Sequence, residues 1–271
     1  MCVLWIIMLL AVATTPLLSC SSRDEDKTCV TDSSLLRIRQ RGTLLVGTTG
    51  DYRPLSFLEA DGHYWGFGIE LAQALAQRLG VEVQFVPTTW PTLTDDVNAQ
   101  PACFDMAMGG ITITPQRQET MLMSEGYLAN GKTILCRADE ASRFGSLADI
   151  DRPEVTVMIN PGGTNEKFAH EQLSHAKLVV HERNEEIPTL VAQGEADVMV
   201  TEITEAPYYI ATDTRLAAPL LATPFTNSKV GVLMRRGQDS LLGAVNTILE
   251  QLKADSTLRR LHKKYGLVYS E

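Results

Sequence analysis

The chain has 271 residues, of which 44% are hydrophobic and 21% are charged, as in an ordinary globular protein. This length is sufficient for a substantial core in one large domain or two modest ones. The net charge of −9 is spread along the chain, which argues against a nucleic-acid surface and against phosphate-rich partners.

An apolar run from residue 3 to residue 18 opens the chain and ends at Ser19 and Cys20, ahead of a polar stretch. It is too short to be read first as a spanning helix, and its position is typical of a signal peptide rather than of a buried helix. We therefore predict a signal peptide over residues 1–20 and export to the periplasm or beyond.

The segment Leu17-Leu-Ser-Cys20 resembles a bacterial lipobox, in which the cysteine is acylated after cleavage. Lipidation of Cys20 would anchor the protein to a membrane through a polar tether of residues 21–34. Leu18 is large for its position and no Lys or Arg precedes the apolar run, so plain secretion remains an alternative. Beyond the leader, Cys29, Cys103 and Cys136 form neither a zinc pattern nor a disulfide framework, and the sequence does not select a pair for a single bridge.

Strands and helices are expected to alternate along the rest of the chain. The first half predicts helices over 35–41 and 69–79 and strands over 43–47, 55–58, 81–86 and 104–108. The second half predicts strands over 154–159, 177–181 and 196–200, followed by amphipathic helices over 241–253 and 258–265. This alternation favours an α/β architecture with mostly parallel sheets.

Two similar units, Met106–Thr114 and Ile159–Asn165, each lead from a strand through a glycine-containing loop into a helix. Ligands bind outside the carboxyl ends of strands in open α/β sheets, where helix N-termini present free N–H groups. Two such loops from two sheets would form opposite walls of a cleft. We therefore predict two lobes, with residues 35–133 and 226–271 in lobe 1 and residues 134–225 in lobe 2.

The run Gly109-Gly-Ile-Thr-Ile-Thr-Pro-Gln-Arg117 carries suitable chemistry for one wall. Its glycines allow close backbone approach, Thr112 offers a hydroxyl, and Arg117 offers a fork of donors suited to a carboxylate. The run resembles the ligand motif of polar amino-acid-binding proteins of the periplasm. That resemblance implies a type II periplasmic-binding-protein fold, with Gly110, Thr112 and Arg117 holding an α-amino acid group. One departure is Gly68, where the family usually has an Asp that caps the next helix.

Within this superfamily the chain is most similar to the periplasmic cyclohexadienyl (arogenate/prephenate) dehydratases. Five segments carry the resemblance, and they are Thr48–Tyr52, Val86–Pro91, Asn130–Thr133, Asn160–Phe168 and Ala196–Glu205. Ordinary binders keep an acid at the position of Glu202, which holds the ligand's amino group. The dehydratases add a glutamate three residues later, which matches Glu205 and serves as the general acid.

Prephenate and arogenate lose water and CO₂ together, and little is required beyond protonating the departing hydroxyl. A sequestered glutamate with a raised pKa can supply that proton, so no metal or organic cofactor is expected. The resemblance implies that Arg117 fixes a substrate carboxylate. The remaining substrate-binding residues are then Trp90, which would wall the ring, with Gly110, Thr112, Lys132, Asn160, Thr164 and Glu202.

Taken singly, these residues have simpler interpretations. Arg117 could be a solvated charge on a helix face, and Glu205 an acid on a helix surface. Asn160 could be a turn former, Trp90 a core aromatic and Lys132 a residue with a structural role. His63, His170, His175, His181 and His262 show no ligand spacing and are predicted to lie on the surface.

The alternative function is a non-catalytic amino-acid-binding protein that feeds an ABC permease, with Arg117 and Glu202 bracketing the ligand. The sequence does not rank prephenate against arogenate.

Overall fold

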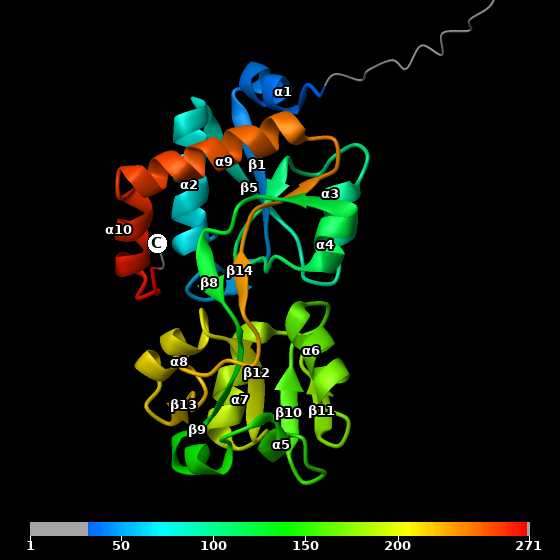
Figure 1. The fold of residues 1–271 in the computed structure, drawn as a ribbon, viewed down its shortest axis with the longest axis vertical. Coiled ribbons are helices and arrows are strands. Elements are labelled where there is room, and N and C mark those ends of the chain that lie inside the picture. Colours follow the sequence, from blue (N-terminus) through cyan, green and yellow to red (C-terminus); the bar gives the residue numbers. More distant parts are fainter. Residues whose placement is uncertain (1–31, 270–271) are drawn as a thin grey trace, which may run out of the picture. The chain divides into compact units, whose positions relative to one another are not determined.

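A computed structural model describes residues 32–269. The predicted signal peptide, Cys20 and Cys29 lie outside these residues, as does most of the predicted tether. The two five-stranded sheets of the described part lie apart, one in each lobe, and two chain crossings connect the lobes (Figure 1). The α/β class and the two-lobed arrangement predicted from the sequence are confirmed.

The sheet of lobe 1 has the strand order β5-β1-β6-β15-β7. Its first three strands are parallel, and β15 runs antiparallel to both of its neighbours. The strands are β1 (Thr43–Thr48), β5 (Glu82–Pro87), β6 (Met106–Ala107), β7 (Met121–Met123) and β15 (Leu233–Arg235). The helices of this lobe are α1 (Ser34–Arg41), α2 (Phe67–Leu79), α3 (Leu93–Asn98), α4 (Pro115–Thr120), α9 (Asp239–Ala254) and α10 (Thr257–Lys264).

The sheet of lobe 2 has the order β11-β10-β12-β9-β13, with a parallel core of three strands and two antiparallel strands at one edge. The strands are β9 (Lys132–Arg137), β10 (Thr156–Ile159), β11 (Lys177–Val180), β12 (Val198–Glu202) and β13 (Leu216–Ala217). The helices are α5 (Leu147–Ile150), α6 (Thr164–Gln172), α7 (Ile187–Gln193) and α8 (Ala206–Thr212), with the short 3₁₀ helices η1 (Ala138–Arg143) and η2 (Asn184–Glu186).

Strand β10 shows why its sequence reads as an unbroken apolar run. Val157 and Ile159 pack into one hydrophobic cluster, while Met158 between them packs into another on the opposite face of the sheet. Successive side chains of a strand point to opposite faces, and both faces of this sheet are covered by helices. Every position of the strand interior is therefore apolar, and the central strands of lobe 2 were predictable.

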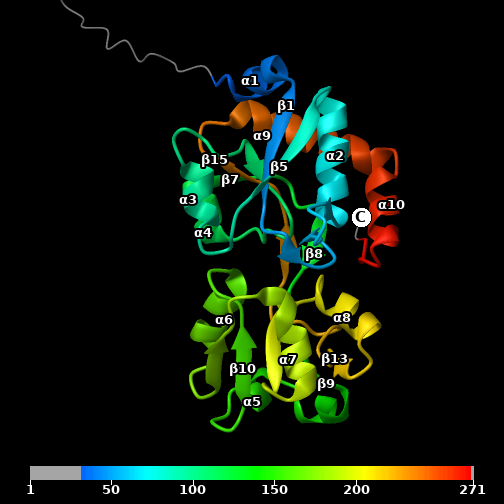
Figure 2. The same ribbon diagram turned by 180° about the vertical axis from the view of Figure 1, so that it is seen from behind.

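The chain crosses between the lobes at β8 (Leu128–Asn130) and β14 (Ser228–Val230), which pair antiparallel and lie between the two sheets in both views (Figure 2). These crossings lie beside the lobe divisions predicted after residues 133 and 225, which stay predictions. A small meander of β2 (Asp51–Tyr52), β3 (Ser56–Leu58) and β4 (Tyr64–Trp65) completes lobe 1.

Three details correct the sequence analysis. The strand predicted over 104–108 spans only two residues, and the helix expected from residue 69 begins at Phe67. Gly66 therefore takes the position before that helix and Gly68 lies inside it, where a Cβ would sit 3.0 Å from the carbonyl oxygen of Leu55. His262 is buried rather than on the surface, because its ring packs edge-on against Phe67 and its Nδ1 lies 2.8 Å from the Leu258 carbonyl.

No helix within residues 32–269 combines the length and apolar character needed to cross a bilayer. In the same part of the chain, Cys103 is exposed, Cys136 is buried and both are free.

Candidate active site

A pocket lies between the lobes and draws its lining from both. Lobe 1 contributes Tyr52, Trp90, Gly110 and Arg117, and lobe 2 contributes Asn160, Gly163, Thr164, Asn165 and Glu202. Six of these nine residues were predicted to bind substrate. The two glycine loops identified in the sequence thus meet at one pocket, each at the carboxyl end of its strand.

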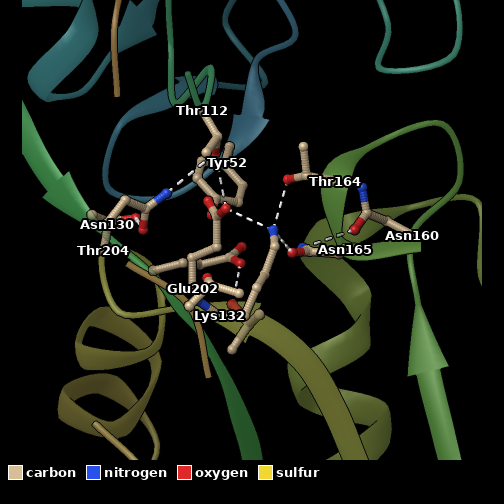
Figure 3. Close-up of polar contacts among 12 residues, drawn as sticks. Tyr52, Thr112, Asn130, Lys132, Asn160, Thr164, Asn165, Glu202 and Thr204 are labelled. Atoms are coloured by element: carbon tan, nitrogen blue, oxygen red, sulfur yellow. Dashed lines mark hydrogen bonds and ion pairs between the residues drawn. The ribbon is translucent and has the colours of Figure 1, made fainter. Parts of the chain in front are cut away.

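Glu202 is the centre of the polar contacts in this pocket (Figure 3). Its carboxylate accepts hydrogen bonds from Tyr52 Oη at 2.5 Å and Thr112 Oγ1 at 3.0 Å, and it forms an ion pair with Lys132 Nζ at 2.7 Å. Burial alone would raise the pKa of Glu202, but the Lys132 ammonium and these donors hold it below its ordinary value. Glu202 is therefore an ionised carboxylate whose charge is already compensated by the protein.

Lys132 also contacts the helix that forms the wall in lobe 2. Its Nζ donates to Thr164 Oγ1 and to Asn165 Oδ1, both at 2.6 Å, and Asn165 Nδ2 donates to Asn160 Oδ1 at 3.2 Å. All three ammonium protons thus have acceptors, which a buried lysine requires. Figure 3 shows these side chains converging from β9, from the loop after β10 and from the start of α6.

The start of α6 faces the pocket through Gly163, Thr164 and Asn165. The first N–H groups of a helix have no partner within the helix and carry a partial positive charge. In the loop ahead of it, Gly162 has a φ of +77°, and a Cβ there would come within 2.3 Å of the Pro91 nitrogen of lobe 1. Only glycine allows the two lobes to approach so closely at this point.

Arg117 brings a cation to the opposite wall. One guanidinium nitrogen donates to the Thr112 carbonyl at 2.7 Å, and no carboxylate within residues 32–269 pairs with it. Beside it, Gly110 has a φ of +103°, and a Cβ there would lie 2.6 Å from the Tyr52 ring. The glycine is thus required both by its backbone conformation and by the tyrosine packed against it.

Trp90 lines the pocket with its indole ring, whose Nε1 donates to Asp51 Oδ1 at 3.0 Å. The ring meets Tyr52 edge to face at 5.7 Å between centroids. Burial raises the pKa of the Asp51 carboxyl. Trp90 is therefore fixed in orientation by a polar contact at one edge while its apolar surface faces the pocket.

Glu205 differs from the other predicted site residues because it is fully buried and does not line the pocket. It follows β12 directly before α8; its Oε1 accepts from Asn184 Nδ2 at 2.9 Å, and its Oε2 lies 2.5 Å from Thr201 Oγ1. Burial raises its pKa to about 8, and the nearby acids Glu202 and Asp51 push it in the same direction. At neutral pH this carboxyl therefore holds a proton.

A further contact joins the lobes away from the pocket. Arg53 of lobe 1 stacks on the Phe57 ring and donates to Tyr208 Oη of α8 at 3.2 Å. The Trp65 ring lies 6.3 Å from the Tyr208 ring. These aromatic and cationic side chains connect the meander β2-β3-β4 with the second lobe.

Comparison with known proteins agrees with this geometry. The family of bacterial extracellular solute-binding proteins, family 3, matches residues 44–268. The chain belongs to this family. Because the family is extracellular, membership supports the predicted export and a small amino-acid or carboxylate ligand.

One family relative is the cyclohexadienyl dehydratase of Pseudomonas aeruginosa, 41% identical over 207 residues that cover 76% of each protein. Among solved structures, an ancestral amino-acid-binding protein, a precursor of cyclohexadienyl dehydratase, is 41% identical with a TM-score of 0.79, covering 86% of this chain and 99% of that one. An ancestral cyclohexadienyl dehydratase is 51% identical with a TM-score of 0.53, covering 85% and 95%.

The structure also identifies polar residues to which the sequence analysis assigned no role. Tyr52, Asn165, Thr201 and Asn184 all bond to a predicted site residue. Tyr52 and Asn165 lie in segments that already stood out in the sequence, whereas Asn184 lies in a charged stretch with no distinguishing pattern. No cluster of His, Cys, Asp and Glu able to hold a metal ion occurs within residues 32–269.

Proposed function

We propose that this protein is an exported cyclohexadienyl dehydratase, a carbon–oxygen lyase that converts prephenate to phenylpyruvate, arogenate to phenylalanine, or both. The observation that carries the proposal is Glu205, a fully buried carboxyl with a pKa of about 8 and no cation bonded to it. A pure binding site has no need for a sequestered neutral acid, whereas the dehydration requires a proton donor at neutral pH. The 41% identity to the Pseudomonas aeruginosa dehydratase supports the same conclusion.

The reaction balances with one proton from this acid. The ring carboxylate leaves as CO₂, and the electron pair of the broken C–C bond enters the ring as it becomes aromatic. The C4–O bond breaks at the same time, and the hydroxyl departs as water after taking the proton of Glu205. The resulting carboxylate regains its proton from solvent when the product leaves. Because Glu205 does not line the pocket, the carboxyl must turn toward the substrate or pass the proton through the Thr201 hydroxyl.

The pocket offers the complementary binding groups. The Arg117 guanidinium has free donors for one substrate carboxylate, and the start of α6 offers N–H groups for another. Trp90 presents an apolar surface to the ring, and Asn160 and Thr112 provide neutral polar groups. Arg117 lines the pocket and Lys132 lies directly behind its Glu202 wall, so two cations stand against one ionised carboxylate, and the surplus positive charge suits an anionic substrate.

A non-catalytic amino-acid-binding protein of an ABC importer is the second candidate, favoured by the TM-score of 0.79 to an ancestral amino-acid-binding protein. In that case Glu202 would hold the ammonium of the ligand and Arg117 its carboxylate. The Lys132 ammonium already occupies Glu202 at 2.7 Å, which weighs against a ligand cation there. We therefore place the dehydratase first.

Turnover by the purified mature protein separates the two candidates. Incubation with prephenate and with arogenate should release phenylpyruvate or phenylalanine together with CO₂. A protein that turns over neither substrate, yet is stabilised saturably against heat by one amino acid, would establish the binding function instead. Substrate incubated alone and substrate incubated with heat-denatured protein serve as blanks for uncatalysed breakdown.

We also propose that Cys20 carries a lipid anchor after the predicted signal peptide is cleaved directly before it. Expression of the full chain in a bacterial host should place it in the membrane fraction. The Cys20→Ser variant should appear in the soluble periplasmic fraction if the anchor exists, and an unchanged distribution would favour plain secretion.

A further inference from the structure

Asn184 is a fully buried residue at the start of η2 in lobe 2, and its amide contacts both lobes. Its Nδ2 donates to Glu205 Oε1 at 2.9 Å and to the backbone carbonyl of Asp51, in β2 of lobe 1, at 3.1 Å. Of the two side chains within residues 32–269 that hydrogen-bond to the Glu205 carboxyl, Thr201 and Asn184, only Asn184 also bonds to lobe 1. It lies outside the lining of the pocket.

The orientation of this amide follows from chemistry. The Asp51 carbonyl can only accept a hydrogen bond, so the Asn184 atom that faces it must be the NH₂ group. The reversed amide would set its oxygen against that carbonyl. Because the same NH₂ group faces Glu205 Oε1, that carboxyl oxygen acts as an acceptor.

The position of the Glu205 proton is thereby determined. A neutral carboxyl carries a single proton, and a hydrogen-bond acceptor facing an NH₂ group does not carry it. The proton therefore resides on Oε2, and in this neutral state Oε2–H donates to Thr201 Oγ1, 2.5 Å away. Asn184 selects which oxygen is protonated without touching the substrate.

The same amide continues a line of hydrogen bonds into the other lobe. The backbone carbonyl of Asp51 accepts a hydrogen bond from Asn184 Nδ2, and its side-chain Oδ1 accepts one from Trp90 Nε1 at 3.0 Å. The proton donor is thus linked to the aromatic wall through Asp51 and Asn184. In this orientation the Asn184 Oδ1 atom is buried without a partner. The two hydrogen bonds of the NH₂ group therefore hold the amide in place even though one acceptor stays unsatisfied.

We propose that Asn184 is a positioning residue that keeps the acid proton on Oε2 of Glu205 and makes this arrangement depend on contact between the lobes. This inference rests on the proposed dehydratase function for its kinetic consequence, but the hydrogen bond itself can be tested without turnover. When the lobes separate, Asn184 loses the Asp51 carbonyl, and Glu205 loses the constraint on its proton.

The kinetic test compares wild type with Asn184→Ala and with Asn184→Asp, which keeps the shape but lacks the NH₂ group. We expect kcat to fall between about tenfold and a hundredfold, since a misplaced proton donor loses most of its advantage. KM should stay within about twofold because Asn184 does not line the pocket. As a control, Asn246→Ala removes an amide of α9 whose Oδ1 accepts from the Glu125 backbone N–H, away from the pocket, and should leave both constants unchanged.

The pH profile distinguishes positioning from a structural role. The rate should fall as pH rises through the Glu205 pKa, since only the protonated acid reacts. Loss of the Asn184 donor removes a bond that favours the carboxylate, so this falling limb should move to higher pH in both variants. Other groups that bear on Glu205 remain in place, namely Glu202, Asp51, Lys132, Tyr52 and Tyr209. An unmoved limb with an unchanged kcat would overturn the proposal.

An NMR titration of the wild-type protein tests the hydrogen bond even if the variants misfold or the protein is not a dehydratase. The side-chain ¹⁵N and ¹H signals of Asn184 should titrate with a midpoint near the Glu205 pKa, and the titration should vanish in Glu205→Gln. An Asn184 signal that does not respond to pH would refute the contact. If wild type is inactive on both substrates but this titration is present, only the dehydratase function has failed.

Discussion

Glu202 and Glu205 lie three residues apart at the end of the same strand, and the backbone N–H of Glu205 donates to the Glu202 carbonyl. Both carboxyls are buried, but their surroundings differ. Glu202 accepts from the Lys132 ammonium, the Tyr52 phenol and the Thr112 hydroxyl, and its pKa is lowered. Glu205 has an amide and a hydroxyl but no cation, and its pKa is raised. Burial of a carboxyl does not by itself decide its charge, and one lysine separates an ionised acid from a neutral one.

The most severe test of this contrast is the removal of the neutral acid. Glu205→Gln keeps the shape and the hydrogen bonds but cannot give a proton, so we expect turnover to fall by about 10²- to 10⁴-fold. Binding of substrate, measured by calorimetry, should change little because Glu205 lies outside the pocket lining. A Glu205→Gln variant with full activity would remove Glu205 from the mechanism and leave the fold assignment intact.

The next largest effect concerns the cation that Glu205 lacks. Lys132→Met leaves Glu202 as a buried charge without its partner, and we expect a loss of about 3–5 kcal/mol in the free energy of unfolding. The double variant Lys132→Met/Glu202→Gln removes both charges and should recover most of this loss. Urea unfolding of the two variants measures the difference, and equal stabilities would show that Lys132 does not compensate Glu202.

The smallest of the three effects follows from the Glu205 pKa itself. Between about pH 4.5 and pH 8 the folded protein holds a proton on Glu205 that the unfolded chain has released. The stabilisation by this group is complete at the lower end and declines as pH rises, by roughly 3–4 kcal/mol across the window. Glu205→Gln lacks this decline, so the stability difference between wild type and variant should shift by that amount from pH 5 to pH 8. A constant difference would show that Glu205 titrates normally.

The local parts of the site were predictable from the sequence, and the parts assembled by long-range contacts were not. Arg117 and Thr112 belong to one short run that also contains the glycine the fold requires, so a local pattern identifies them. Asn184 reaches Glu205 across 21 residues and Asp51 across 133, and a neutral amide in a charged stretch gives no signal of either contact. Sequence patterns report periodicity and local turn chemistry, whereas such bonds depend on how two sheets are placed.

The same distinction explains the errors in the fold. Strands β10 and β12 were predictable because both of their faces are buried, which makes them continuous apolar runs. Strand β9 was not predicted from the sequence, and its first residue, Lys132, is a polar residue in an otherwise largely buried strand. Lys132 is present there because Glu202 stands opposite it in the antiparallel register.

The placement of the tryptophans has a practical consequence for measuring the protein. Trp65 and Trp90 both lie in lobe 1. Trp65 lies beside Tyr208 of lobe 2, and Trp90 lines the pocket between the lobes. The third tryptophan of the sequence, Trp5, falls in the predicted signal peptide. Once the predicted signal peptide is removed, the two remaining indoles lie at the boundary of the lobes, and ligand titrations can be followed by intrinsic fluorescence without an attached label.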